Sequence, residues 1–245
     1  MENNKDYEDF ISTVSHELRT PLTSIRGFSQ TMLSSWDKLD EENKKKFIKI
    51  IEQQSQRLIN LVENMLAVTK LNSKNIFVYN ETDVKSLIEQ TVTIVKSKYS
   101  SKNFSFTCPN NLPNIFVDKD KFQQIMTNLI ENGAKYSTDD SDILICAHSK
   151  GDTVEITVSN KGIGIDPKDY EKIFTKFARI DNPLTRKVQG SGLGLYITKS
   201  LTEKMGGCIS VKSEKIENSE YSNITFTLVM PVKNIEEQTR IKCSQ

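Results

Sequence analysis

The chain has 245 residues, of which 27% are charged and 36% are hydrophobic, so we expect a folded protein with a large polar surface. Its 33 lysine and arginine residues against 32 aspartate and glutamate residues leave a net charge of +1, which gives no general attraction to nucleic acid or to an anionic membrane. No segment approaches the ~20 apolar residues of a membrane span, and residues 1–6 are too polar for a secretion signal, which predicts an intracellular chain without a membrane segment.

The first part of the chain predicts a helical hairpin. Between Asp6 and Leu71 there is one glycine and one proline, and apolar residues recur at helical spacing. Residues 34–43 interrupt this pattern, and Asp40 is expected to cap the second helix. Apolar side chains of that helix step by four and three, which is typical of a bundle seam. Two helices cannot cover such a seam, so we expect a homodimeric four-helix bundle, with packing on the rest of the chain as the alternative.

The second part predicts a mixture of strands and helices. The β-prone runs are residues 76–79, 104–107, 115–117, 143–148, 153–159, 208–212 and 223–229. The helical patterns are residues 84–98, 119–136 and 192–204. Together they predict an α+β two-layer sandwich, with helices on one face of a largely antiparallel sheet. The expected division is an all-α hairpin over 1–72, the α+β domain over 73–232 and a frayed tail over 233–245.

One histidine lies apart from the apolar face of the first helix. At about 100° per residue, His16 points roughly 180–200° away from the direction of the apolar side chains, so it should be exposed. Thr20 lies one turn later over the same face, and Glu17 is close enough to approach the imidazole. Pro21 removes the amide that would bond the Glu17 carbonyl, which loosens the helix. Most exposed histidines are ordinary surface residues, so this arrangement alone assigns no chemistry.

The surrounding residues, FISTVSHELRTPLTSIRGF at 10–28, resemble the phospho-acceptor box of bacterial sensor histidine kinases, whose pattern runs S-H-E-L-R-T-P-L. The resemblance implies that His16 accepts a phosphoryl group from ATP and that Glu17 holds or accepts the opposite ring proton. It also implies a homodimer, and transfer of the phosphoryl group to an aspartate of a separate response-regulator receiver domain. In kinases that reverse this transfer, Thr20 would orient the attacking water.

A nucleotide site is expected in the second part, although no G-x-x-x-x-G-K-[ST] loop occurs. Asn128 and Asn132 project from one helix face, and their amide oxygens suit Mg²⁺. Lys135 and Tyr136 follow, as a cation and a hydroxyl for phosphate oxygens.

Two glycine-rich segments follow that helix. Residues 160–165 (NKGIGI) come after a strand, and their glycines let the backbone approach a flat ligand. Residues 190–195 (GSGLGL) open a helix whose free amides can hold phosphate.

The order and the residue sequences of these segments resemble those of the Bergerat-type ATP-binding domain of histidine kinases. Gyrase and the heat-shock chaperone share this type of domain. Residues 123–137 (QQIMTNLIENGAKYS) are similar to its asparagine box, and Phe174 and Phe177 to its phenylalanine box. The resemblance implies bound ATP and Mg²⁺, with Asn132 on the metal and a mobile lid over 178–190 that carries Arg179, Arg186 and Lys187. The residues implied to bind the nucleotide are Asn128, Asn132, Lys135, Tyr136, Asn160, Gly162, Gly164, Ile165, Phe177, Arg179, Gly190, Ser191, Gly192, Leu193 and Gly194. Asn128 is also expected to take part in catalysis.

One position departs from the family pattern. The family has an acid two residues before the first glycine, where it accepts a hydrogen bond from the adenine amino group, and this chain has Asn160. A neutral hydrogen bond is weaker than a charged one, so we expect ATP binding weakened by roughly 1 kcal/mol, about fivefold. An alternative is a dimeric signalling scaffold whose degenerate pocket no longer supports catalysis.

A hydrolytic ATPase of the same fold is a further alternative. It would need a glutamate four residues before Asn132, where this chain has Asn128, and Glu131 lies about 100° from that face. This arrangement disfavours hydrolysis. Because family members carry an N-terminal sensor, often with membrane spans, we expect this chain to be cytoplasmic, either as the catalytic part of a larger or membrane-anchored sensor or as a soluble kinase that senses a partner.

Overall fold

The structure is a computed structural model that describes residues 2–72, 77–139, 141–180 and 190–232. The chain divides into two compact units, Met1–Lys70 and Leu71–Gln245, and each is described by itself. The division lies two residues before the boundary expected from the sequence. Within the described ranges, no helix combines the length and the apolar character needed to cross a bilayer.

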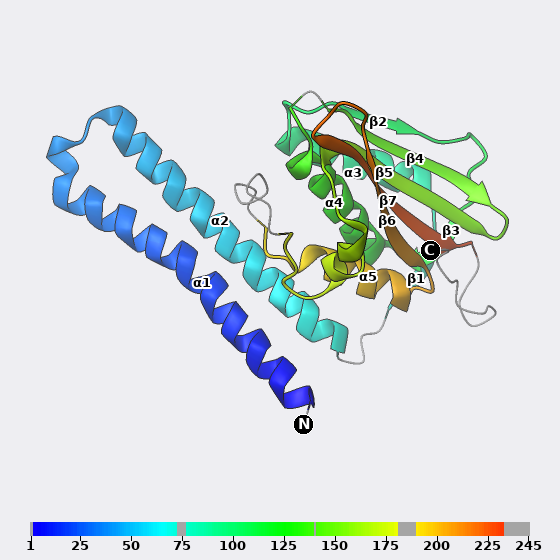
Figure 1. Cartoon of the computed structure of the whole chain (residues 1–245), viewed down its shortest axis with the longest axis horizontal. Coiled ribbons are helices and arrows are strands. Elements are labelled where there is room, and N and C mark those ends of the chain that lie inside the picture. The colour runs from blue at the N-terminus through cyan, green and yellow to red at the C-terminus, as the bar shows by residue number, and fades with distance from the viewer. Residues whose placement is uncertain (1, 73–76, 140, 181–189, 233–245) are drawn as a thin grey trace. The chain divides into compact units, whose positions relative to one another are not determined.

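The first unit is the predicted helical hairpin (Figure 1). Helix α1 spans Glu2–Ser35, a short 3₁₀ turn η1 spans Trp36–Lys38, and α2 spans Glu41–Asn72. Asp40 caps α2 as expected, because its Oδ1 accepts a hydrogen bond from the backbone N of Asn43 over 2.7 Å. The rings of Phe28 and Phe47, 5.1 Å apart, pack the two helices together near the turn.

The hairpin has one buried seam and one uncovered apolar stripe. Met32, Leu61 and Val68, which belong to the apolar side chains that recur at helical spacing, are buried. A second stripe on α2 stays between 45% and 53% exposed, and it consists of Ile48, Ile59, Val62 and Leu66. At 100° per residue these four side chains lie within about 60° of one another. Leu22 of α1 is also apolar and is 53% exposed. The single chain therefore leaves part of its apolar surface uncovered.

The second unit is built on a five-stranded sheet in the order β2-β4-β5-β7-β6. Its strands are β2 (Phe104–Thr107), β4 (Ile143–Lys150), β5 (Thr153–Ile163), β6 (Cys208–Lys215) and β7 (Tyr221–Pro231). β2 and β4 are parallel, and every other pairing in this sheet is antiparallel. The tight turn at Gly151, with φ of +60°, joins β4 to β5.

A separate two-stranded sheet pairs β1 (Tyr79–Thr82) with β3 (Ile115–Asp118). The sequence placed the first of these strands at 76–79, three residues too early, and residue 76 lies outside the described residues. The stacked rings of Tyr79 and Phe116, 5.9 Å apart, show that packing between the two strands fixes their register.

Helices form the second layer of this unit. They are α3 (Val84–Lys98), α4 (Lys119–Tyr136) and α5 (Gly194–Lys204), and two 3₁₀ turns, η2 (Pro167–Asp169) and η3 (Lys172–Phe174), precede α5. Gly133 of α4 packs against Ile143 of β4 and Val158 of β5, and Figure 1 shows α4 alongside the sheet. The predicted two-layer α+β architecture is confirmed.

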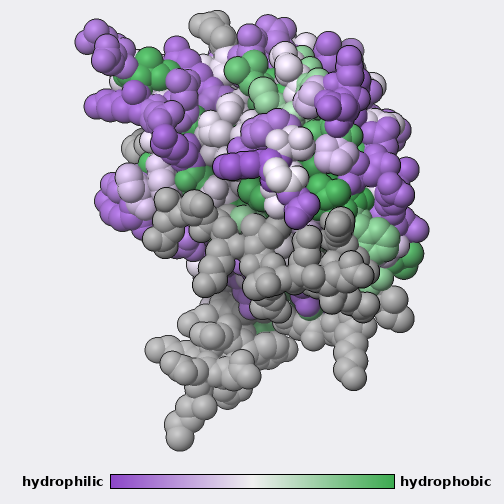
Figure 2. All heavy atoms as spheres, turned by 90° about the vertical axis from the view of Figure 1, so that its right-hand side faces the viewer, coloured by the Kyte–Doolittle hydropathy of each residue, from purple (hydrophilic) through white to green (hydrophobic). Residues whose placement is uncertain are grey.

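The surface agrees with the polar composition. Figure 2 shows one side of the molecule, on which hydrophilic side chains predominate and hydrophobic ones form small separate patches. The apolar residues of the second unit are instead used in the layer between the helices and the sheet, where Phe122, Ile125, Ile145 and Ile156 have no exposed surface.

Candidate functional site

His16 is exposed on α1, as its helical position predicts. The hydroxyl of Thr20 donates a hydrogen bond to the backbone carbonyl of His16 over 3.3 Å. Pro21 lies inside α1 and is buried. The imidazole is therefore accessible to a reactant, on a helix segment from which proline has removed one backbone hydrogen bond.

The Glu17 carboxylate is engaged by a residue that the sequence analysis did not identify. Its Oε2 accepts a hydrogen bond from Nη2 of Arg57 on α2 over 3.0 Å, and the two side chains are 25% and 21% exposed. The sequence offered no local pattern that would pair Glu17 with Arg57, which lies 40 residues away. The ion pair joins the two helices of the hairpin next to His16, so Glu17 must share or leave Arg57 if it is to meet the imidazole.

Asn128 connects the asparagine-bearing helix to the second glycine segment. Its Nδ2 donates to Oγ1 of Thr198 on α5 over 2.8 Å. A Cβ added at Gly194 would collide with the Asn128 side chain, so the first residue of α5 has to be glycine for this approach. In this structure Asn128 therefore holds α4 and α5 together.

Lys135 lies in an ion-pair network on α4. Its Nζ is 3.0 Å from Oε2 of Glu131, whose other oxygen is 2.8 Å from Nζ of Lys98 on α3. Burial raises the pKa of the Glu131 carboxyl, but Lys135 and Lys98 together outweigh burial and leave that pKa below its ordinary value. Glu131 is thus ionised at neutral pH, and a phosphate that binds Lys135 would compete with it. Asn132, between these residues, is half-buried.

Tyr136, at the end of α4, is half-buried close to the second glycine segment. Burial raises the pKa of its phenol above the ordinary value, although the positive charge of Arg179 acts in the opposite direction. The phenol is therefore a neutral hydrogen-bond donor at physiological pH. Its oxygen lies 3.4 Å from where a Cβ on Gly190 would be. Tyr136, Arg179 and Gly190 thus lie near one another, and their binding of phosphate stays a prediction.

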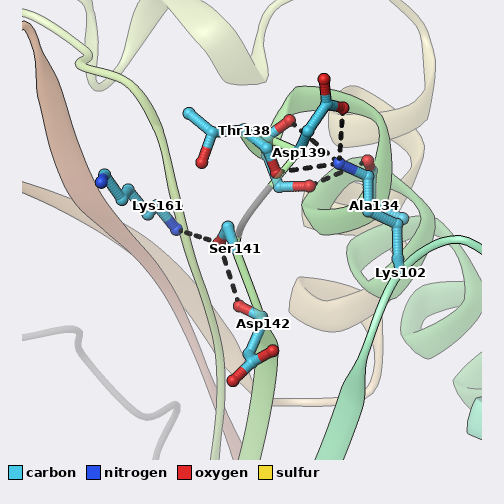
Figure 3. Close-up of polar contacts among 8 residues, drawn as sticks. Lys102, Ala134, Thr138, Asp139, Ser141, Asp142 and Lys161 are labelled. Atoms are coloured by element: carbon cyan, nitrogen blue, oxygen red, sulfur yellow. Dashed lines mark hydrogen bonds and ion pairs between the residues drawn. The ribbon is translucent and has the colours of Figure 1, made fainter.

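The first glycine segment is fastened to the end of α4 (Figure 3). The backbone N of Thr138 donates to the Lys161 carbonyl, and the backbone N of Lys161 donates to Oγ of Ser141, both over 2.9 Å. Lys102 donates from Nζ to the Thr138 carbonyl over 2.8 Å, where a cation suits the negative end of the helix. This junction holds the end of β5 in a fixed position beside the asparagine-bearing helix.

The glycines of this segment make room for the protein's own atoms. A Cβ on Gly162 would collide with the carbonyl oxygen of Tyr136, and a Cβ on Gly164 would collide with Oγ of Ser222. These glycines were expected to let a flat ligand approach, whereas their close neighbours in the structure belong to α4 and β7. Next to them, the backbone N of Ile165 donates to Oγ of Ser213 over 3.0 Å.

Asn160 is buried, with only 6% of its surface exposed. It continues the row of β5 side chains that face the helices, after Val154, Ile156 and Val158. In the part of the chain that the structure describes, its Nδ2 is buried without a hydrogen-bond partner. Because buried amides are nearly always paired, this one indicates a position prepared for a ligand.

The second glycine segment packs closely on the phenylalanine box. Gly192, with φ of +68°, lies so close to the backbone of Phe177 that a Cβ there would collide with it. Phe177 itself has φ of 59°, which is uncommon for a residue with a side chain. Leu193 is fully buried, and its backbone N lies 3.3 Å from Oγ of Ser191, which accepts the hydrogen bond. The expected lid residues Arg186 and Lys187 lie outside the described residues.

The site contains no carboxylate or thiolate cage for a metal. No group of three or more histidine, cysteine, aspartate or glutamate side chains within the described ranges could hold a metal ion. Mg²⁺ bound with a nucleotide usually takes one or two protein oxygens together with phosphate oxygens and water. The amide oxygen of Asn132 fits that requirement, and it remains the predicted protein ligand.

Two family models match the chain. Residues 6–74 match the His Kinase A (phospho-acceptor) domain, and residues 117–234 match the histidine kinase-, DNA gyrase B- and HSP90-like ATPase family. The chain is 32% identical over 241 residues to sensor histidine kinase WalK of Bacillus subtilis, which covers 95% of this chain and 38% of that protein. It is 32% identical over 216 residues to sensor protein SrrB of Staphylococcus aureus, and this match covers 84% of this chain and 36% of SrrB. The chain thus spans less than two fifths of the length of these relatives.

Solved structures share the fold. The histidine kinase ThkA in complex with the response regulator protein TrrA matches with a TM-score of 0.76 and 25% identity, over 97% of this chain and 65% of that chain. The histidine kinase AdeS of Acinetobacter baumannii matches with a TM-score of 0.66 and 21% identity, over 89% of this chain and 98% of the AdeS chain. Full-length ShkA in complex with AMPPNP matches with a TM-score of 0.64 and 24% identity, over 92% of this chain and 46% of the ShkA chain.

Proposed function

This chain belongs to the histidine kinase family, and from that membership we propose that it transfers the γ-phosphoryl group of ATP to its own His16. The observation that carries the proposal is the exposed imidazole of His16 within the matched phospho-acceptor segment, in a chain that also matches the ATPase family. No observation favours the alternative of a degenerate scaffold.

The chemistry follows from the residues around His16. A neutral ring nitrogen attacks the γ-phosphorus in line, the bond from that phosphorus to the β–γ bridging oxygen breaks, and ADP leaves. The proton on the other ring nitrogen is held or accepted by Glu17, once its carboxylate turns from Arg57 toward the imidazole. The protein contributes mainly by positioning the two reactants.

The second unit binds the nucleotide in this proposal. Lys135 and Tyr136 contact phosphate oxygens, with Arg179 nearby, and the amides at the start of α5 add further donors. Asn132 holds Mg²⁺, which neutralises charge on the phosphates when it is bound. Asn128 keeps α4 and α5 in register through its hydrogen bond to Thr198, so its part in the reaction is to position the other groups.

We further propose a homodimer that covers the exposed stripe of Ile48, Ile59, Val62 and Leu66. An uncovered apolar stripe along a hairpin helix is what a four-helix bundle of two chains would bury. Val62→Glu and Leu66→Glu should each make the protein monomeric in sedimentation velocity at concentrations where the wild type is dimeric. Asn60→Glu, exposed on α2 but away from the stripe, is the matched control and should leave the dimer intact.

The phosphoryl group would pass from His16 to an aspartate of a response-regulator receiver domain on another chain. The TrrA complex of the related ThkA supports a partner of this class. In the reverse direction Thr20 would orient the water that attacks the aspartyl phosphate, so Thr20→Ala should reduce dephosphorylation of the regulator while His16 is still phosphorylated. We also propose that this catalytic part acts in the cytoplasm, as the family resemblance implies.

The kinase proposal is tested by incubating the protein with Mg²⁺ and radiolabelled ATP and examining the stability of the protein-bound label. Phosphohistidine is labile in acid and stable in base, so the wild type should carry such a label. His16→Gln should carry none. His148→Gln, which alters the only other histidine of the sequence, should be labelled like the wild type. Acid-labile label on the His16→Gln protein would remove the assignment of His16 as acceptor.

A further inference from the structure

The surroundings of Asn160 fix its backbone but not its side-chain amide. Its backbone is paired with Ile224 in the sheet. The next residue, Lys161, accepts a hydrogen bond from the backbone N of Thr138 and donates one to Ser141, and the second of these is drawn in Figure 3. The side chain lies on the inward face of β5 with Nδ2 buried and without a partner among the described residues. Since the Nδ2 group is unpaired, no hydrogen bond from it determines which way the amide points.

An asparagine amide can offer two opposite kinds of hydrogen bond. Its oxygen accepts and its NH₂ group donates, and a half-turn of the terminal torsion exchanges their positions. An ionised aspartate at the same place could only accept. The 6-position of a purine distinguishes the two cases, because adenine has an amino donor there while guanine and hypoxanthine have a carbonyl acceptor.

We propose that Asn160 lets this kinase bind 6-oxopurine nucleoside triphosphates, with inosine triphosphate as the simplest, nearly as well as ATP. The inference rests on the proposed function, because it takes Asn160 to face the base of the bound nucleotide. The amide oxygen accepts from the adenine amino group, and after a half-turn the amide NH₂ donates to the hypoxanthine carbonyl. The orphaned Nδ2 then has a partner, and the chain lacks the acceptor-only carboxylate that would reject a 6-carbonyl.

The test compares three nucleotides whose purines differ at the 6-position, and of which inosine triphosphate also carries a hydrogen on N1. ATP carries an amino group, inosine triphosphate carries a carbonyl, and purine riboside triphosphate carries hydrogen. Dissociation constants of their magnesium complexes with the whole chain would be measured by calorimetry. For the wild type we expect the dissociation constants of ATP and inosine triphosphate to lie within about fivefold of each other. The dissociation constant of purine riboside triphosphate should be at least about fivefold higher than either.

Two variants make the test specific to Asn160. Asn160→Asp should bind ATP about fivefold more tightly and inosine triphosphate at least tenfold more weakly than the wild type, because a carboxylate repels the carbonyl. Asn160→Leu should bind ATP and purine riboside triphosphate, which differ only at the 6-position, alike. Asn223→Asp adds the same charge at an exposed position of β7, paired with Lys161, and should keep the wild-type ratios. Thermal melting confirms that each variant is folded.

The outcomes separate the two proposals. If the wild type is phosphorylated on His16 by ATP but binds inosine triphosphate more than about fiftyfold less tightly, the inference about Asn160 fails and the kinase proposal stands. Equal binding of all three nucleotides by the wild type also removes the inference, because the amide would then contact no 6-substituent. Binding of none of them would overturn both proposals. If Asn160→Asp does not fold, the wild type and Asn160→Leu still decide the question.

Discussion

Oε2 of Glu17 on α1 accepts a hydrogen bond from Nη2 of Arg57 on α2, over 3.0 Å, one residue from the proposed phosphoryl acceptor. The pair spans 40 residues of sequence and is mostly shielded from solvent on both sides. It therefore links the acidic neighbour of His16 to the register of the helical hairpin. A change in how α1 packs on α2 would change where the Glu17 carboxylate lies.

Breaking this pair should destabilise the hairpin modestly. We expect Arg57→Gln to lower the free energy of unfolding by about 0.5–1 kcal/mol, since the pair is only partly buried. Urea unfolding followed by circular dichroism measures the loss. A double-mutant cycle with Glu17→Gln should return a coupling energy of the same size. Strictly additive losses would mean that the two side chains do not interact in solution.

Removing Glu131 should strengthen nucleotide binding. The carboxylate of Glu131 forms an ion pair with the ammonium group of Lys135. Phosphate oxygens that bind Lys135 therefore have to compete with this carboxylate. We expect Glu131→Gln to tighten Mg-ATP binding by up to about fivefold at low salt, and by less at high salt where ion pairs are screened. Calorimetric titration measures the change. The gain should disappear in the Glu131→Gln, Lys135→Ala double variant, and a gain that persists there would contradict the competition.

A methyl group at Gly162 should damage the nucleotide site. It would collide with the Tyr136 carbonyl, which cannot yield without moving the end of α4. We expect Gly162→Ala to cost roughly 1–3 kcal/mol of unfolding free energy and to weaken ATP binding.

The matched control for this change is Gly27→Ala, because a Cβ at Gly27 has no heavy atom within 4 Å. Gly27 lies within α1, where alanine is favoured over glycine by about 0.5–1 kcal/mol, so this variant should be more stable than the wild type. Thermal melting and ATP titration of both variants measure these effects. Wild-type stability of Gly162→Ala would show that the junction is looser than the structure indicates.

Stability should fall in alkaline solution because of half-buried tyrosines. Burial, with a smaller contribution from Glu131, raises the pKa of Tyr99 above its ordinary value of 10.0, and burial also raises that of Tyr136. Above pH 10 the unfolded chain releases these protons while the folded chain keeps them, so the free energy of unfolding declines as the pH rises. Below that pH both states hold the protons and these groups contribute no pH dependence.

Urea midpoints at about pH 8 and pH 11 measure this decline. The Tyr99→Phe protein should lose less stability between the two pH values than the wild type. An identical decline in both proteins would show that Tyr99 titrates alike in the folded and unfolded chains.

Local patterns predicted most of the fold because its elements follow simple periods. The exposure of His16 follows from helical geometry, and the alternation along β5 extends to Asn160, whose burial was therefore available from the sequence. The strand β1 was misplaced because its exposure does not alternate, and only its pairing with β3 defines it. Such pairing is a tertiary property, which a local pattern does not contain.

The contacts that shape the site were harder to predict. Arg57 meets Glu17 only because the hairpin sets a particular register between two helices. Gly162 has to be glycine because of the Tyr136 carbonyl, and sequence alone does not distinguish room for a ligand from room for the chain itself. In both cases the reason lies between segments that are distant along the sequence, whereas motif analysis considers each segment separately.

The junction of Thr138 and Ser141 with Lys161 also bears on how the protein can change length. An extra residue between Asn132 and Ser141 would displace this junction, so insertions there would separate the amide proposed to bind Mg²⁺ from the strand that carries Asn160. The turn at Gly151 lies at the opposite end of β5. A longer loop there would disturb neither Asn132 nor the junction at Lys161. Lineages descended from this sequence could therefore acquire new appendages at that turn while the nucleotide machinery retains its spacing.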